Sequence, residues 1–460
     1  MMIILILIFL ILLYLALCVA IPPVIGKSRY RKAQDTQQIS DSTRQAGERV
    51  RCLETNQEAL IWWLRVITAA EHTLVMSNHD FRTDNSGKDL LASLLYAADR
   101  GVKVSLLVDG LMNGTQMKWN VYFRALASHP NVEIKIYNQV RLVCFWRMNY
   151  RMHDKYIIAD DHLYILGGRN ANDLFLGNYQ TRQNIDRDIL VYETMPDGRT
   201  SLKELRAYFE KIWQQPCCRL FLSGRNGKKI QRAAEELRRR YQDLELRYWI
   251  SGECHWKELT RPAERISLLA NPAENHNKAP VLWNTLCAQM QTGSDVRIQT
   301  PYLICSKNMY QDLRNLTAKG VRIRVLTNAV SNGANYFGCS DYLNQKRKIL
   351  QTGVTVSEYS GRHSLHTKTI LIDRRICISG SFNVDMRSAY LDTELMLLIE
   401  SLELVKQLEE IAEEIEKSSR TYPHSVHTDV EEHEALSLPI RKNCLFAFLR
   451  LLDRPFHYLL

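Results

Sequence analysis

The stretch RMHDKYIIADDHLYILGGRN, residues 151–170, decides the fold of this chain. Two short apolar runs of β-prone residues flank the polar pair Asp160-Asp161, and this pattern predicts a β-hairpin. His153 and Lys155 open the hairpin two residues apart, so an extended chain turns both side chains to one face. A hairpin with only a structural role has no need of an imidazole and an ammonium group placed together.

A second stretch, LHTKTILIDRRICISGSFN at residues 365–383, repeats this spacing. The matched pairs are His153 with His366, Lys155 with Lys368, Asp160 with Asp373, and Asn170 with Asn383. One short motif of this kind has a high false-positive rate, whereas two copies with the same glycine and asparagine offsets are not a chance match.

The repeat extends to the segments that precede each hairpin. Residues 87–110 show the pattern of an amphipathic helix, then Gly101, then an apolar strand. Residues 308–330 show the same order around Gly320. Because helices alternate with strands in both segments, the sequence predicts one α/β layer structure in each half of the chain.

The length of 460 residues favours at least two domains. We expect the following organisation: a transmembrane anchor at 1–26, a basic juxtamembrane segment at 27–54, a first α/β domain at 55–200, a helical connecting region at 201–265, a second α/β domain at 266–420, and a tail at 421–460. The connecting region is helical and basic, and its charges are expected on a solvated face.

Both ends of the chain suggest contact with a membrane. The first 26 residues carry no charged side chain, are long enough to span a bilayer, and are followed at once by cations. The positive-inside rule then places the body in the cytoplasm. A cleaved signal peptide is the alternative, but no basic segment precedes the apolar run. Residues 441–460 suit an interfacial helix or a tail packed on the body.

The composition limits the classes of function. A net charge of +10 suggests an anionic partner, either nucleic acid or a membrane surface. The apolar fraction of 46% excludes a disordered chain. Eleven scattered cysteines without paired metal-ligand spacing predict neither a zinc site nor a disulfide framework. We expect no cofactor and no metal.

The paired hairpin motifs resemble the HKD signature of the phospholipase D superfamily, over about residues 55–415. Residues 151–175 and 365–395 are most similar to bacterial cardiolipin synthases, particularly of the C type. This resemblance implies two phospholipase D-like domains, each a mixed β-sheet flanked by helices. It also implies that a pseudo-twofold axis relates the domains, with one active site at their interface.

The resemblance also implies roles for the repeated residues. One histidine attacks phosphorus to give a phosphohistidine, and the other exchanges protons with the leaving and entering alcohols. We assign His153 as the nucleophile and His366 as the acid and base, although the near-symmetric repeat allows the reverse. The groups expected to hold the phosphoryl oxygens are Lys155, Lys368, Asn170 and Asn383. Asp160 and Asp373 are expected to fix the hairpin turns and not to touch the substrate.

A catalytic histidine usually needs a carboxylate on its second nitrogen to set its orientation. Members of the superfamily supply this carboxylate from a strand after the motif. The matching segments here are DRDILVYE, which gives Asp188, and DTELMLLIE, which gives Glu394. Asp186 or Asp392 could serve instead.

The sequence therefore predicts a membrane-anchored phosphatidyltransferase that makes cardiolipin from phosphatidylglycerol and a second phospholipid, phosphatidylglycerol or phosphatidylethanolamine. Water as the acceptor would make it a phospholipase D, and a nuclease of the same superfamily is a further alternative. A tethered scaffold that only binds anionic lipid is opposed by the intact motifs. The expected partners are phospholipids and an anionic cell-membrane surface, without nucleic acid or an obligate protein partner.

Overall fold

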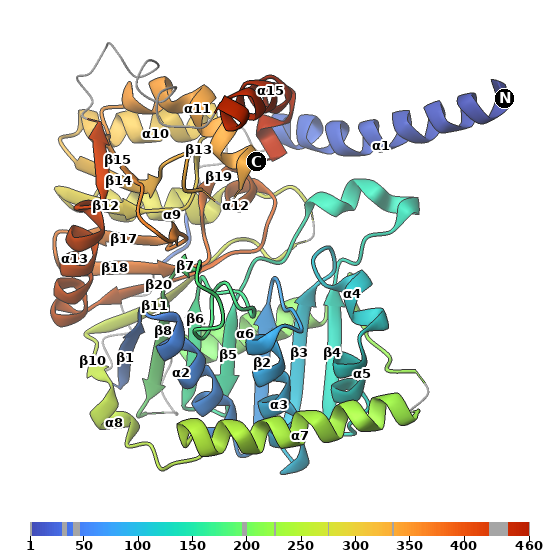
Figure 1. Cartoon of the computed structure of the whole chain (residues 1–460). Helices are drawn as coiled ribbons and strands as arrows, with labels where there is room; N and C mark the ends of the chain where they lie inside the picture. The colour runs from blue at the N-terminus through green and yellow to red at the C-terminus, as the bar shows by residue number, and fades with distance from the viewer. Residues whose placement is uncertain are drawn as a thin grey trace.

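Two mixed β-sheets form the body of the chain, one in the lower and one in the upper half of Figure 1. The computed structural model describes residues 2–29, 35–39, 47–195, 200–224, 227–274, 276–333, 335–422 and 440–459. Strands and helices alternate through both halves, as the sequence predicts. The fold class is α/β.

The lower sheet has nine strands. In spatial order these are β10 (Arg261–Pro262), β1 (Glu48–Leu53), β8 (Asp188–Glu193), β6 (Leu163–Gly167), β5 (Tyr156–Ala159), β2 (Thr73–Asn78), β3 (Lys103–Asp109), β4 (Val132–Tyr137) and β9 (Cys218–Leu220). The pairs β2–β3 and β3–β4 are parallel, and the other pairs are antiparallel.

The upper sheet has eight strands. In spatial order these are β11 (Arg265–Ala270), β20 (Leu395–Glu400), β18 (Ile376–Gly380), β17 (Thr369–Ile372), β12 (Asp295–Gln299), β14 (Arg322–Asn328), β15 (Thr355–Tyr359) and β21 (Ser419–Tyr422). The parallel pairs β12–β14 and β14–β15 match β2–β3 and β3–β4. From β11 to β21 the upper sheet therefore repeats the order and direction of the lower sheet from β1 to β9.

Helices complete both halves. Those of the first half are α2 (Asn56–Ala69), α3 (Asn85–Asp99), α4 (Gly114–Trp119), α5 (Val121–Ala127), α6 (Ser201–Trp213), α7 (Lys228–Tyr248) and α8 (Trp256–Leu259), with the 3₁₀ helix η2 at Leu142–Asn149. Those of the second half are α9 (Val281–Met290), α10 (Lys307–Ala318), α11 (Tyr336–Leu350), α12 (Met386–Tyr390), α13 (Leu402–Glu416) and α15 (Ile440–Phe456), with η3 at His457–Leu459.

Local sequence signals set the ends of the repeated helices. Asp84 accepts a hydrogen bond from Gly87 N at the start of α3, and Ser306 accepts one from Met309 N at the start of α10. Gly101 and Gly320 follow the two helices with φ of 99° and 91°, a left-handed conformation that favours glycine. The helix, glycine and strand order expected from residues 87–110 and 308–330 is confirmed.

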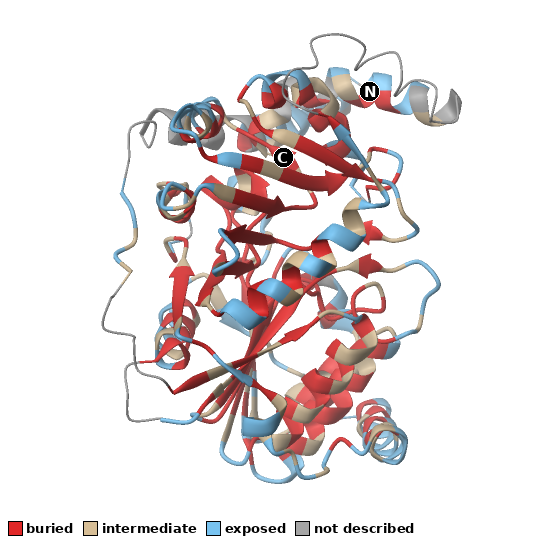
Figure 2. Ribbon diagram, turned by 90° about the vertical axis from the view of Figure 1, so that its left-hand side faces the viewer, coloured by how far each residue is buried: buried red, intermediate tan, exposed pale blue. Residues whose placement is uncertain are grey.

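Three apolar clusters hold the layers together. One lies between the lower sheet and helices α2, α3 and α7, and a second fills the upper half. A third combines side chains of both sheets with α6 and α13. Figure 2 shows the strands of both sheets largely buried, in agreement with a core shared by the two halves.

Residues 201–265, predicted as a helical connection, also belong to the first half. Strands β9 and β10 extend the lower sheet at its two edges, and α7 packs against α3 and α5. β1 also precedes the predicted start of the first domain at residue 55. β9 and β10 have only three and two residues, so no periodic pattern distinguishes them.

The two ends of the chain are helical. α1 (Met2–Arg29) covers the predicted anchor, packs against η2, and projects from the body in Figure 1. Across the residues that the structure describes, no helix is found that is long and apolar enough to cross a membrane. α15 packs on α11 and buries Phe446 and Leu449, so the tail packs on the body.

Candidate active site

The two hairpins are β5–β6 and β17–β18, and an aspartate at each turn fastens it to the neighbouring strand. Asp160 and Asp373 both have φ of 48°. The Asp160 carboxylate accepts hydrogen bonds from the backbone N–H groups of Glu71, His72 and Thr73. Burial raises the pKa of Asp160, but these three donors outweigh it and hold the pKa below its ordinary value.

Asp373 has the equivalent contacts in the second half. Its carboxylate accepts hydrogen bonds from the backbone N–H groups of Ser294 and Asp295, at the start of β12. Both aspartates therefore lie at the hairpin turns, as the sequence predicts. They contact backbone groups at the end of the hairpin that is opposite to the histidines.

We predict that Asp160→Ala lowers the free energy of unfolding by about 2–3 kcal/mol, because three backbone donors lose their acceptor and alanine is strained at positive φ. Turnover per folded molecule should change less than twofold. Urea unfolding monitored by circular dichroism, combined with an activity assay, checks both. Asp160→Asn keeps one acceptor oxygen and tolerates this backbone conformation, so it should be milder. A hundredfold loss of turnover at unchanged stability would instead place Asp160 in contact with the substrate.

Each histidine is held by a carboxylate from the opposite half of the chain. His153 Nδ1 lies 2.9 Å from Glu394 Oε1, and His366 Nδ1 lies 2.6 Å from Asp186 Oδ2. Both carboxylates are buried. A neutral imidazole donates Nδ1–H in such a contact, which leaves Nε2 with a free lone pair.

Backbone contacts between the halves set these pairs in place. His153 N donates to Thr393 O at 3.3 Å, and Thr393 N donates to Arg151 O at 3.0 Å. In the equivalent position, β7 (Asn184–Ile185) pairs in parallel with β16 (Ser364–Leu365). His366 N then donates to Ile185 O at 2.7 Å. Each histidine therefore directly follows a short backbone pairing between the two halves. In both pairings, the segment from the other half continues directly into the carboxylate residue that contacts the histidine.

Asp188 is not the partner of a histidine, contrary to the prediction. Its Oδ2 accepts a hydrogen bond from Trp63 Nε1 at 3.0 Å and lies 3.4 Å from Arg169 Nη1. The strand register explains the error, because Gly167 pairs with Asp188 whereas Gly380 pairs with Met396. The structural equivalent of Glu394 is therefore Asp186.

Asp392, the other alternative, also contacts no histidine. Its Oδ1 accepts hydrogen bonds from Arg151 N at 3.2 Å and from Arg387 Nη2 at 3.1 Å. It thus helps to join the two halves beside the site.

The two motif lysines are buried beside the histidines. The Nζ atoms of Lys155 and Lys368 donate to the backbone carbonyls of His153 and His366, respectively. Lys368 Nζ also lies 3.7 Å from Asp186 Oδ2. Burial lowers the pKa of Lys155 to about 7, a shift that the other lysine increases and Glu394 opposes.

The ionisation of the histidines and carboxylates follows from burial and from these lysines. Burial, and next the adjacent lysine, lowers the pKa of both histidines, that of His366 to about 4. Burial raises the pKa of Asp186, but Lys368 and His366 outweigh it and lower the pKa to about 2. Burial raises the pKa of Glu394 well above its ordinary value. Both imidazoles are therefore neutral near pH 7, and an anionic ligand would favour their protonation.

The asparagines of the motifs are buried at equivalent positions. Asn170 Oδ1 and Asn383 Oδ1 are buried, and neither has a hydrogen-bond partner within the described ranges. Each side chain therefore keeps one polar atom without a protein partner among the described residues. The structure thus brings together the histidines and lysines of both motifs, with Asp186 and Glu394 behind the histidines.

Sequence reasoning missed four side chains that contact the centre. The rings of His79 and Phe175 meet those of His153 and His366 edge-on, at centroid distances of 4.9 and 4.8 Å. The hydroxyls of Ser381 and Ser388 donate to Glu394. His79 directly follows the apolar strand β2, and this position at the carboxyl end of a parallel strand was an available signal.

The arrangement suits displacement at the phosphorus of a phosphodiester. It provides two imidazoles that can act as nucleophile and proton carrier, and two ammonium groups that can balance the phosphoryl charge. Among the described residues, no group of three or more His, Cys, Asp or Glu side chains is arranged to hold a metal ion.

Comparisons with known proteins identify relatives of this chain. A family model described as "Cardiolipin synthase, PLD-like domain" matches residues 63–213 and 286–415. The chain is 28% identical over 401 residues to cardiolipin synthase C of Escherichia coli, covering 78% of this chain and 82% of that protein. It is 26% identical over 397 residues to cardiolipin synthase 1 of Bacillus cereus, with coverages of 85% and 69%.

A solved structure shares the fold. The crystal structure of phosphatidylserine synthase from Haemophilus influenzae Rd KW20 superimposes with a TM-score of 0.64 at 16% identity, covering 95% of this chain and 100% of that one. At this identity the likeness concerns the arrangement of the chain and not its chemistry.

Proposed function

This chain belongs to the cardiolipin synthase family of the phospholipase D superfamily of enzymes, and we propose that it is a phosphatidyltransferase that makes cardiolipin. The observation that carries the proposal is the pair of histidines, each held by a carboxylate from the other half. The named relatives support phospholipids as the substrate class. The acceptor would be a hydroxyl group of phosphatidylglycerol.

In the proposed mechanism, the reaction takes two displacements at phosphorus. Nε2 of neutral His153 attacks, a P–N bond forms, and the P–O bond to the leaving alcohol breaks as His366, which is protonated when the anionic phosphodiester is bound, donates its Nε2 proton to the leaving oxygen. The incoming hydroxyl then gives its proton to His366, its oxygen attacks phosphorus, and the P–N bond breaks. The low pKa of Asp186 supports this assignment, because an ionised carboxylate stabilises the imidazolium form of His366.

The remaining groups would position the phosphodiester. Lys155 and Lys368 lie next to the histidines and would balance the phosphoryl charge. The free polar atoms of Asn170 and Asn383 would bind the phosphoryl oxygens. The donor is phosphatidylglycerol or phosphatidylethanolamine, and the leaving alcohol is then glycerol or ethanolamine.

Lipid analysis of a cardiolipin-deficient host tests the proposal. We expect cardiolipin in membranes of cells that express the intact protein and none in cells that express His153→Ala at the same level. His162→Ala is a matched control, because His162 lies in the turn of the same hairpin and outside the site. Accumulation of phosphatidic acid would identify water as the acceptor. No change in either lipid would contradict the proposal and make nucleic acid the next substrate to test.

We also propose that residues 1–26 anchor the chain in the cell membrane with the body in the cytoplasm. The support is the uncharged apolar sequence of α1 and the cations that follow it. The side chains of Leu7 and Leu10 are 54% and 52% exposed, so the body does not cover them.

Charges placed in this segment should release the protein from membranes. We expect the intact protein to resist alkaline carbonate extraction and the double variant Leu7→Arg/Leu10→Arg to be extracted, because an arginine in the hydrocarbon core costs up to about 2.5–3.5 kcal/mol. The double variant Leu7→Ala/Leu10→Ala is the control and should resist extraction. Retention of the arginine variant in the pellet would contradict the anchor.

A further inference from the structure

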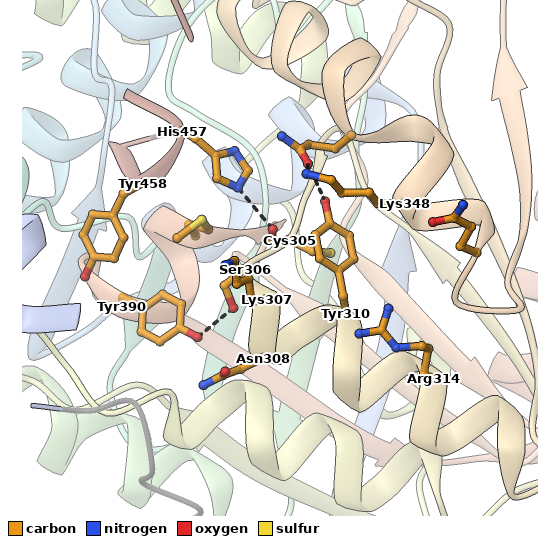
Figure 3. A pocket seen from close by; sticks show the side chains of 13 residues that line it. Cys305, Ser306, Lys307, Asn308, Tyr310, Arg314, Lys348, Tyr390, His457 and Tyr458 are labelled. Carbon is orange, nitrogen blue, oxygen red and sulfur yellow. Dashed lines mark hydrogen bonds between the residues drawn. The ribbon is translucent and has the colours of Figure 1, made fainter. Parts of the chain in front are cut away.

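A cavity of about 390 Å³ lies in the second half between α10, α11 and the end of the chain, and Figure 3 shows its lining. It includes none of the histidines, lysines or asparagines of the two motifs. Its size is within the range of small-molecule sites. The proposed reaction uses no residue of this lining, so the cavity needs a separate explanation.

The charge of the lining is entirely positive. Lys307 and Arg314 on α10 and Lys348 on α11 line the cavity, and no carboxylate does so among the described residues. Arg314 and Lys348 donate to the neutral amides of Gln311 and Gln345, at 3.2 and 3.1 Å. Within the described part of the chain, none of the three cations has a carboxylate partner within salt-bridge distance, so their charges would attract an anionic group into the cavity.

The rest of the wall is largely apolar. Tyr310, Tyr390 and Tyr458 line the cavity together with Met386. The rings of Tyr390 and Tyr458 stack at a centroid distance of 6.1 Å, and the Tyr390 hydroxyl lies 2.9 Å from Ser306 Oγ. Three cations beside apolar rings suit a ligand that carries both a negative charge and hydrocarbon.

The end of the chain forms one side of the cavity. His457 Nδ1 lies 2.7 Å from Asp341 Oδ2, and its Nε2 lies 3.2 Å from Cys305 O, which fixes this wall against the body. His457 directly follows α15, and α15 exposes Leu445, Phe448 and Leu451 at 41%, 59% and 63%. The helix that leads into the cavity wall therefore presents apolar side chains to its surroundings, as interfacial helices do.

We propose that this cavity binds the phosphate headgroup of an anionic phospholipid, at a site separate from the two histidines. The three cations hold the phosphate, the tyrosine rings contact the glycerol and upper acyl carbons, and the exposed face of α15 lies in the surrounding lipid. The proposal rests on the proposed function only in taking a phospholipid membrane as the working environment.

Calorimetric titration of the full chain in a nonionic detergent tests this site. The protein carries His153→Ala to prevent turnover, and the probe is dihexanoyl phosphatidylglycerol. We expect two sites per chain, one at the histidines and one in the cavity. Lys307→Gln with Lys348→Gln should weaken one of them at least tenfold. Lys319→Gln, at the end of α10 and outside the lining, should leave both unchanged.

The outcomes separate this proposal from the proposed function. A single site that the paired glutamine substitutions remove supports the cavity and counts against phospholipid binding at the histidines. If the variant with both Lys307→Gln and Lys348→Gln binds the probe as its parent does, the cavity site is overturned. A parallel titration with glycerol 3-phosphate should show at least tenfold weaker binding. Equal affinity for that chain-free ester would overturn the lipid assignment in favour of a soluble phosphate ester. Circular dichroism verifies that each variant is folded.

Discussion

Alanine in place of His153 is expected to reduce phosphatidyl transfer by at least about 10⁴-fold, because the covalent step loses its nucleophile. Alanine in place of His366 should cause a similar loss on natural phospholipids, whose alkoxide leaving groups need a proton. The two variants should differ with a phosphatidyl ester of nitrophenol, because nitrophenolate departs without protonation. His366→Ala should still release one equivalent of nitrophenolate, whereas His153→Ala should release none.

Stopped-flow absorbance of nitrophenolate measures this burst, and an acid-labile phosphorus label on the protein measures the covalent intermediate. His162→Ala should keep both the burst and steady turnover, since His162 lies in the hairpin turn. A burst that survives in His153→Ala and disappears in His366→Ala would reverse the two roles. A burst that survives in both single variants would mean that neither histidine is the sole nucleophile.

The electrostatic difference between the two half-sites explains why a nearly symmetric repeat should have unequal roles. Asp186 lies against Gly168, where an added Cβ atom would come within 2.4 Å of the Asp186 Oδ1 atom. Lys368 and His366 keep the Asp186 carboxylate ionised. Glu394 instead accepts hydrogen bonds from two serine hydroxyls, and burial raises its pKa. An ionised carboxylate favours a protonated imidazole, and a carboxyl of raised pKa does so less. The acid and base role therefore suits His366 better than His153.

The sequence was informative where the information was local. The hairpins, their turn aspartates and the helix ends at Gly101 and Gly320 each depend on a few adjacent residues, and the structure has them in place. The internal repeat then predicted two equivalent halves, which the common strand order confirms. Both predictions depend on the spacing of residues along the chain, which can be read from a single sequence.

The rest depends on pairing between distant segments. Asp186 and Asp188 have the same strand parity and the same chemistry, so only the register of β6 with β8 distinguishes them. The edge strands β9 and β10 have no periodic signal either. Tertiary contacts decided these features, and one sequence alone does not encode them in a local pattern.

Separate substitutions of Asp186 and Asp188 should distinguish a carboxylate that orients a histidine from one that stabilises the fold. Asp186→Asn is expected to lower turnover by about 10³–10⁴-fold, because the amide no longer stabilises the imidazolium of His366 and favours the wrong tautomer. Its melting temperature should change little. Asp188→Asn leaves the buried Arg169 guanidinium without its charged partner, so it should cost about 3–5 kcal/mol of stability.

Turnover per folded molecule and thermal unfolding, measured on both variants, distinguish these effects. Folded Asp188→Asn protein should retain at least a third of the parent turnover below its melting temperature, because its side chain contacts Trp63 and Arg169 and neither histidine. The contrary result, an active Asp186→Asn enzyme beside a stable and inactive Asp188→Asn enzyme, would mean that the histidine depends on Asp188. The two carboxylates lie two residues apart and have different partners. Asp186 contacts the imidazole that changes its protonation in the proposed mechanism, and Asp188 contacts a guanidinium that stays charged.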